Sequence, residues 1–383
     1  MAYIALHRTS FALLIATLAT PGCGEPVAQP VEDASIDSNE YEEVLAAREL
    51  DYSAALKAAA LRLTGDAPAL EEIRQVANGT RYERHAAYQS VLRDYLARPA
   101  FARQMFYFWR DAFRVGGTPA ADTAPAFAAQ LTVNNGSYLE LFTRNSANCP
   151  TFDEATATFQ DAECTNGGPQ VGVLTNPGAM AAFVSSLGFR RVRWIQETFA
   201  CARFPVEVSG PPRDVGGILP YVGLWPFGSV ASPATGGRIN FQDVESTVCM
   251  NCHQTINHIA PLFAYYDETG AYRSSIAVGT PFDGPVATLA DYLPATETTA
   301  WRYGVAAPDL RALGAAMAAD DDVIRCAVAR VWNWALGKAD IVDAQQDVPE
   351  ETIRAQVAAF KDGDFKLKDL VFSVFDSEDF TRY

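Results

Sequence analysis

The stretch Ala100–Phe113, AFARQMFYFWRDAF, is the clearest indication of the fold class in this chain. It crowds six large apolar side chains into one short segment, and aromatic density of this kind is more typical of a helix-bundle core than of a cofactor-binding segment. These residues are Phe101, Met105, Phe106, Phe108, Trp109 and Phe113. We therefore expect a buried helix inside a helical module.

Signals for further helices lie on both sides of this stretch. Apolar residues recur at three-to-four spacing before Thr64-Gly65, and Thr80 with Glu83 forms the pattern of a capping box. Helices are expected at 42–63, 68–78, 80–98 and within 125–144. These segments predict an N-terminal helical module over residues 41–145.

The C-terminal residues 306–383 predict a second helical module. Its helices are expected at 309–319, 323–336, 349–360 and 367–375. Residues 146–305 lie between the modules and contain a polar loop, 146–169, shorter helical segments at 177–183 and 190–201, and a stretch rich in Pro and Gly, 203–238. A loop that long is usually functional or disordered, and its interleaved apolar residues favour function. The predicted fold class is mainly α, with two helical modules around this Pro/Gly-rich region.

Charge and hydropathy limit the partners of the chain. Its 383 residues include 30 Lys and Arg against 46 Asp and Glu, a formal net charge of −16. Nucleic-acid binding needs basic surface that displaces counterions from phosphates, so no nucleic-acid partner is expected. No run of about 18 strongly apolar residues follows the N-terminus, so no membrane-spanning helix is expected.

The N-terminus predicts export and a lipid anchor. Residues 1–22 combine one firm positive charge, Arg8, with an apolar segment and a Pro-Gly turn, the order of a secretory signal peptide. Cys23 follows Gly22, and this junction resembles the lipobox of bacterial lipoproteins, although Thr20 stands where that motif prefers Leu. We expect acylation of Cys23, a tether over residues 23–40, and a location that is lipid-anchored at the outer membrane or periplasmic.

The pentapeptide Cys249-Met-Asn-Cys-His253 is the pattern that carries chemistry. C-x-x-C-H is the attachment signature of c-type haem, and chance alone gives it in about one chain in a thousand of this composition. Two thiols three residues apart on a helical turn reach both vinyl groups, and the next residue directs an imidazole to the iron. The alternatives are a disulfide redox pair, which lacks its βαβ setting here, and a zinc site completed by His258.

The segment Cys249–Arg273 resembles the haem segment of the planctomycete-type cytochrome-c-like proteins. The shared positions are Ile256, Tyr266-Asp267, Gly270 and Arg273. Asn257-His258 departs from an Asp-Pro pair, and Ala260 from a Gly. Weaker similarity lies at 62–65, 172–175, 190–201 and 326–337. The resemblance implies a haem segment flanked by helical modules and no particular reaction.

Haem chemistry assigns roles to the residues of the motif. Cys249 and Cys252 would form the thioethers, and His253 would be the proximal iron ligand, whose other ring nitrogen needs an acceptor such as a backbone carbonyl. Met180 is the first candidate for the sixth ligand. The other candidates are Met317, which also fits an apolar helix seam with Leu310 and Leu313, and behind them His258 and His85.

Four arginines are candidates to pair with the haem propionates, and a solvated basic face explains them equally well. They are Arg190, Arg191, Arg193 and Arg273.

Four further cysteines predict disulfides in an oxidising compartment. They are Cys149, Cys164, Cys201 and Cys326, which allow three pairings. We favour Cys149 with Cys164, which would staple the polar loop, so that Cys201 with Cys326 would tie the helices on either side of the haem segment.

The sequence as a whole predicts an extracytoplasmic monohaem c-type cytochrome that carries electrons to a redox partner protein. Electron transfer is favoured over catalysis. A peroxidase-like haem oxidoreductase is the first alternative, and it would need an open sixth iron position with a distal acid or base. A zinc-stabilised binding protein is the second.

Overall fold

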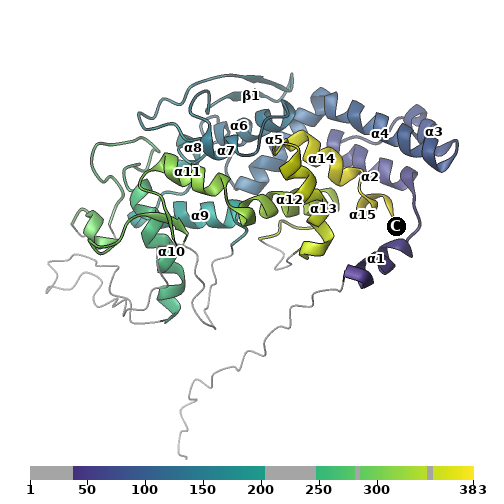
Figure 1. The fold of residues 1–383 in the computed structure, drawn as a ribbon. Coiled ribbons are helices and arrows are strands. Elements are labelled where there is room, and N and C mark those ends of the chain that lie inside the picture. The colour runs from purple at the N-terminus through teal and green to yellow at the C-terminus, as the bar shows by residue number, and fades with distance from the viewer. Residues whose placement is uncertain (1–37, 203–246, 281–284, 303, 343–347) are drawn as a thin grey trace, which may run out of the picture. The chain divides into compact units, whose positions relative to one another are not determined.

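The computed structural model describes residues 38–202, 247–280, 285–302, 304–342 and 348–383, which all belong to one compact unit (Figure 1). The signal peptide, Cys23, most of the tether and the Pro/Gly-rich stretch lie outside the described residues. So do the side chains of residues 247–252 and 254. The described chain is mainly helical, as predicted, with two small antiparallel hairpins.

The N-terminal helices follow the predicted segments closely. They are α1 (Ser38–Ala46), α2 (Tyr52–Thr64), α3 (Leu70–Ala77), α4 (Arg81–Ala97), α5 (Pro99–Phe113), α6 (Thr123–Val133) and α7 (Glu140–Thr143). The prediction of one helix over 42–63 is wrong, because Asp51 interrupts it. The Asp51 carboxylate accepts hydrogen bonds from the backbone N–H groups of Ser53 and Ala54, at 2.8 and 3.1 Å, and so begins α2 as its N-cap.

The remaining elements complete the fold. The helices are α8 (Pro177–Ala182), η1 (Ser186–Gly188), α9 (Phe189–Phe199), α10 (Thr247–Phe263), η4 (Leu289–Asp291), α11 (Leu310–Ala318), α12 (Asp321–Ala335), α13 (Glu350–Asp362), α14 (Leu367–Phe375) and α15 (Glu378–Thr381). The strands are β1 (Thr151–Asp153), β2 (Thr158–Gln160), β3 (Ala300–Arg302) and β4 (Val305–Ala306). β1 pairs with β2, and β3 pairs with β4.

The first hairpin lies in the segment predicted as a polar loop. Phe152 and Phe159 face each other across β1 and β2 with ring centroids 4.7 Å apart, and Phe106 of α5 packs on Phe152 at the same distance. The Asp153 carboxylate accepts from the backbone N–H of Ala155 at 2.9 Å and so forms the turn. An aromatic pair therefore ties this segment to the helical core.

The aromatic helix α5 lies in the core, as the sequence predicts. Its six large apolar residues are all buried, and α5 packs against α2 and α6. The Trp109 indole donates a hydrogen bond of 2.8 Å to the Thr132 hydroxyl of α6. The C-terminal helix α14 contacts α4 and α6, so the two predicted helical modules share one core.

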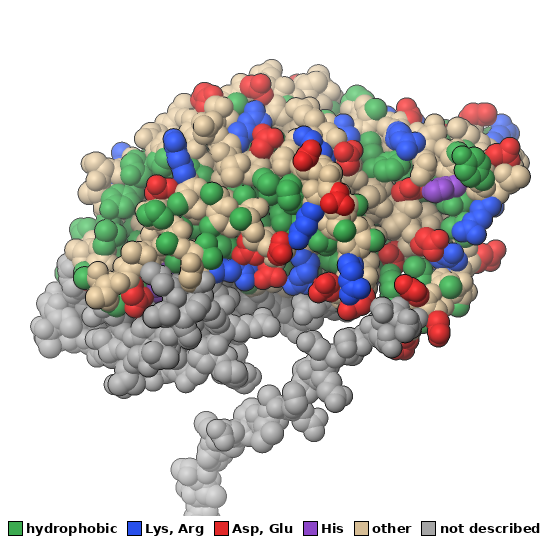
Figure 2. Space-filling model, viewed as in Figure 1, with side chains coloured by type: hydrophobic (Ala, Val, Ile, Leu, Met, Phe, Trp, Pro, Cys, Tyr) green, Lys and Arg blue, Asp and Glu red, His purple; other side chains and the backbone are tan. Residues whose placement is uncertain are grey.

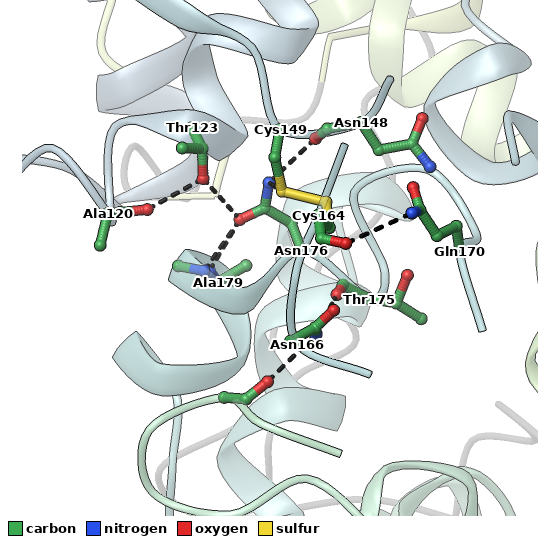
Figure 3. The surroundings of a disulfide bond; sticks show 12 residues. Ala120, Thr123, Asn148, Cys149, Cys164, Asn166, Gln170, Thr175, Asn176 and Ala179 are labelled. Carbon is green, nitrogen blue, oxygen red and sulfur yellow. Dashed lines mark hydrogen bonds between the residues drawn. A yellow bond between two sulfur atoms is a disulfide. The ribbon is translucent and has the colours of Figure 1, made fainter. Parts of the chain in front are cut away.

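Two disulfides join the four cysteines in the pairing that the sequence favours. Cys149 is bonded to Cys164 and Cys201 to Cys326. The first closes the loop that carries the β1–β2 hairpin, and beside it the Asn176 carboxamide donates to the Asn148 carbonyl and caps α8 (Figure 3). The second joins Cys201, two residues beyond the end of α9, to Cys326 of α12. Disulfides of this kind are typical of an oxidising, extracytoplasmic environment.

The surface seen in Figure 2 intersperses acidic and basic side chains, and no basic patch gathers on this face. Within the described residues, no helix combines the length and apolar character that crossing a membrane requires.

Candidate functional site

Helix α10 carries the C-x-x-C-H pentapeptide in its first turns. The backbone is helical from Thr247 to Phe263, so Cys249, Cys252 and His253 occupy positions i, i+3 and i+4 of one helix. Residues at these positions share one side of a helix. The helical geometry is therefore compatible with two thiols and an imidazole acting on one group.

The imidazole of His253 is half-buried and is held by the residue one turn further along α10. Its Nδ1 lies 3.0 Å from the carboxamide oxygen Oδ1 of Asn257, whose side chain is fully buried. A carboxamide oxygen only accepts hydrogen bonds, so this contact assigns the proton to Nδ1 and the lone pair to Nε2. Burial lowers the pKa of His253 below its ordinary value, and the hydrogen bond with Asn257 partly opposes this. A metal-ligating imidazole must be neutral, and this lowered pKa favours the neutral form.

Phe189, the first residue of α9, packs edge-on against the imidazole. The two ring centroids lie 5.2 Å apart at an interplanar angle of 84°. The same phenyl ring makes an edge contact with Tyr292, at 6.2 Å, which ties it to the segment after η4. The orientation of His253 is thus restricted by an apolar ring as well as by a hydrogen bond.

Arg191 of α9 fixes the opposite end of α10. Its side chain is fully buried and donates to four backbone carbonyls, those of Met180, Phe263, Tyr266 and Asp267, at 2.6–3.0 Å. The last carbonyls of a helix have no partner inside the helix, and Arg191 supplies one at Phe263. Burial lowers the pKa of Arg191 to about 10, which leaves it charged at pH 7.

This position corrects the prediction for Arg191, which neither lies on a solvated face nor is available to a propionate. Arg193 pairs with Glu197 at 2.8 Å, and Arg273 pairs with Asp267 at 2.5 Å. Arg190 is exposed, and its side chain forms no ion pair within the described ranges. Of the four candidates, Arg190 is therefore the one that remains open to an anionic partner.

Met180, the predicted sixth ligand, lies at the far end of α10 from His253. Its carbonyl and that of Phe263 bind the same guanidinium, and Phe263 is ten residues, about 15 Å along the helix axis, from His253. The Met180 side chain is fully buried in the apolar core. Ligation of iron by Met180 stays a prediction, and this position weighs against it.

The second methionine candidate, Met317, is buried in α11 together with Leu310 and Leu313. This arrangement agrees with the apolar seam that the sequence indicates for the three residues.

The two histidine candidates are both held by carboxylates. His258 Nε2 lies 2.8 Å from Glu297 Oε2, and His85 Nε2 lies 2.9 Å from Asp376 Oδ1. His258 is five residues beyond His253, about 140° further round α10, so its ring leaves the helix on another side. No group of three His, Cys, Asp or Glu residues that could hold a metal ion occurs in the part of the chain that the structure describes. The position of His258 disfavours its role in the zinc alternative.

Sequence reasoning missed the role of Asn257, which the resemblance presents only as a departure. Its spacing of four residues from His253 is the signal that could have found it, because side chains at i and i+4 of a helix meet. The carbonyl-binding role of Arg191 has no comparable local signal.

Comparison of the chain with models of protein families, with curated proteins and with solved structures finds no match.

Proposed function

We propose that this chain is an exported c-type cytochrome that holds one haem covalently on α10 and carries electrons to a redox partner protein. The observation that carries the proposal is the C-x-x-C-H pentapeptide in the first turns of a helix whose histidine is oriented by a buried carboxamide. The resemblance of Cys249–Arg273 to the haem segment of planctomycete-type cytochrome-c-like proteins supports the same conclusion.

Three residues of α10 would hold the haem, each through a different bond. Cys249 and Cys252 would bind the two vinyl groups as thioethers, and His253 would bind iron through Nε2, because its Nδ1 is engaged with Asn257. Bound haem would supply a one-electron couple between ferric and ferrous iron. Phe189 packs against the imidazole in an edge contact that restricts its orientation.

The disulfides and the N-terminal sequence both support an extracytoplasmic location. The disulfides favour an oxidising compartment, and the signal-peptide pattern with Cys23 supports export with a lipid anchor at the outer membrane or in the periplasm. An anchored cytochrome reaches its redox partner from the membrane surface.

The proposal is tested on the full chain expressed in cells that mature c-type cytochromes. After extraction with acid-acetone, which removes non-covalent haem, we expect the purified chain to retain one haem per polypeptide by intact mass. The variant carrying Cys249→Ala and Cys252→Ala is the control and should lose its haem to the solvent. Wild-type protein whose mass equals the polypeptide alone would refute the proposal, and one bound zinc per chain would favour the zinc alternative.

A further inference from the structure

Asn257 is placed where it can position the imidazole of His253. It is a polar residue with no exposed surface, and it lies one helical turn after the histidine of the pentapeptide. Burying a carboxamide costs free energy unless it is hydrogen-bonded, and Oδ1 of Asn257 accepts from Nδ1 of His253 at 3.0 Å. This hydrogen bond therefore pairs the buried carboxamide oxygen with one ring nitrogen of the imidazole.

The chemistry of the acceptor matters as much as its place. A backbone carbonyl or a carboxamide is a neutral acceptor, whereas a carboxylate would draw the Nδ1 proton and make Nε2 a stronger donor to a metal. An apolar side chain would leave Nδ1–H without this acceptor and would let the ring turn against Phe189. Position 257 can thus set both the orientation and the basicity of His253.

We propose that Asn257 is the positioning residue of the haem iron's histidine ligand: its buried carboxamide selects the Nδ1–H tautomer of His253 and sets the reduction potential through the strength of that hydrogen bond. This inference rests on the proposed function. The step it describes involves no transfer of electrons to or from Asn257.

The first experiment measures the reduction potential of the haem-loaded chain. In Asn257→Asp the carboxylate stabilises ferric iron, so we expect the potential to fall. In Asn257→Leu the acceptor is lost, and we expect it to rise. Each shift should be about tenfold in the reduction equilibrium, which is ~59 mV for a one-electron couple. Shifts of opposite sign are not produced by a merely structural role.

A matched control lies on the same helix. Thr255 is fully buried, and its hydroxyl has no hydrogen-bond partner in the described part of the chain. Thr255→Val should therefore leave the potential unchanged. Equal potentials in the wild type and both Asn257 variants would overturn the inference while the covalent haem kept the proposed function intact. A wild-type chain without haem would overturn both.

The second experiment needs no haem. The chain contains only 4 histidines, so ¹⁵N-histidine labelling of protein made without haem maturation gives a simple nuclear magnetic resonance spectrum. We expect the His253 signals of the wild type and Thr255→Val to show a proton on Nδ1, and those of Asn257→Leu to shift toward the Nε2–H tautomer. An unchanged tautomer in Asn257→Leu would contradict the positioning role even if that variant failed to bind haem.

Discussion

The two ends of α10 are built from different chemistry. At the C-terminal end, a buried guanidinium holds backbone carbonyls from α8, from α10 and from the segment that follows it. At the N-terminal end, side chains meet side chains, with Asn257 and Phe189 orienting His253. A backbone carbonyl is present whatever the residue type, so losing its buried donor always costs free energy, whereas a side-chain partner can be substituted. We infer that the C-terminal end secures the fold and that the N-terminal end can be varied to tune chemistry.

The variant Arg191→Met should have the largest effect, and it tests whether the C-terminal end of α10 secures the fold. The change removes the Arg191 hydrogen bonds to four buried carbonyls. Those of Phe263 and Asp267 keep a backbone donor, from Tyr266 and Gly270, whereas those of Met180 and Tyr266 lose the donor that Arg191 provides. An unsatisfied group costs about 1–3 kcal/mol, so we expect the free energy of unfolding to fall by about 4 kcal/mol. Urea denaturation followed by circular dichroism measures it. Arg190→Met, at the exposed neighbouring position, should change stability by less than about 0.5 kcal/mol. Equal stability of the two variants would contradict the structural role of Arg191.

Met180→Ala separates a core residue from an iron ligand. Because Met180 is fully buried, we expect a loss of about 3 kcal/mol in unfolding free energy. Its place at the end of α10 remote from His253 leads us to expect an unchanged absorption spectrum of the oxidised protein. A spectrum shifted from low spin would instead identify Met180 as the sixth ligand. Residues at both ends of α10 would then contribute to the haem site.

Acid should weaken the C-terminal end of α10, because the carboxylate of Asp267, in the segment that follows this helix, is ionised in the folded state. Asp267 accepts from the Thr269 hydroxyl and from Arg273, and although burial opposes ionisation, these hydrogen bonds hold its pKa at about 2. A lowered folded-state pKa stabilises the fold above the unfolded value near 4, and this contribution is lost as the pH falls from about 4 to about 2.

The Asp267 contribution can be isolated by comparing variants. Solvent screening reduces it to about 1 kcal/mol. Urea unfolding of the wild type and Asp267→Asn between pH 5 and pH 2 should show a smaller decline in the variant. Parallel declines would remove Asp267 from the explanation of acid sensitivity.

Phe189→Leu should have only a small effect on stability. It keeps apolar volume beside His253 and removes the aromatic edge contact, which is worth about 1 kcal/mol. Urea denaturation should therefore show a loss far below that of Arg191→Met, although both residues lie in the first turn of α9. A loss as large as that of Arg191→Met would mean that the N-terminal end of α10 also secures the fold.

Local patterns predict the helices well, because helix caps and apolar spacing depend on residues that are close together in the sequence. Thr80 and Glu83 form the capping box that the sequence indicates, with bonds of 2.8 and 3.3 Å, and α14 covers 367–375 as expected. The break before α2 was missed because Asp51 sits inside an otherwise helical pattern, where only its cap bonds reveal the boundary.

The site is less predictable because its partners are distant in the sequence. Arg191 binds carbonyls 72 to 76 residues further along the chain, and the residue types at Phe263, Tyr266 and Asp267 give no sign of this, since backbone carbonyls occur at every residue. The pentapeptide can be singled out from the sequence because the haem-attachment pattern is defined by the types and spacing of neighbouring residues. The sequence predicts that His253 needs an acceptor such as a backbone carbonyl, and the side chain at i+4 fills that role.

The visible spectrum of the exported protein, oxidised and then reduced, tests most directly whether the N-terminal end of α10 carries a haem. We expect a Soret band from protein-bound haem, and α and β bands that sharpen when dithionite is added. Colourless protein, purified from cells that mature another c-type cytochrome in the same culture, would contradict the assignment of Cys249, Cys252 and His253.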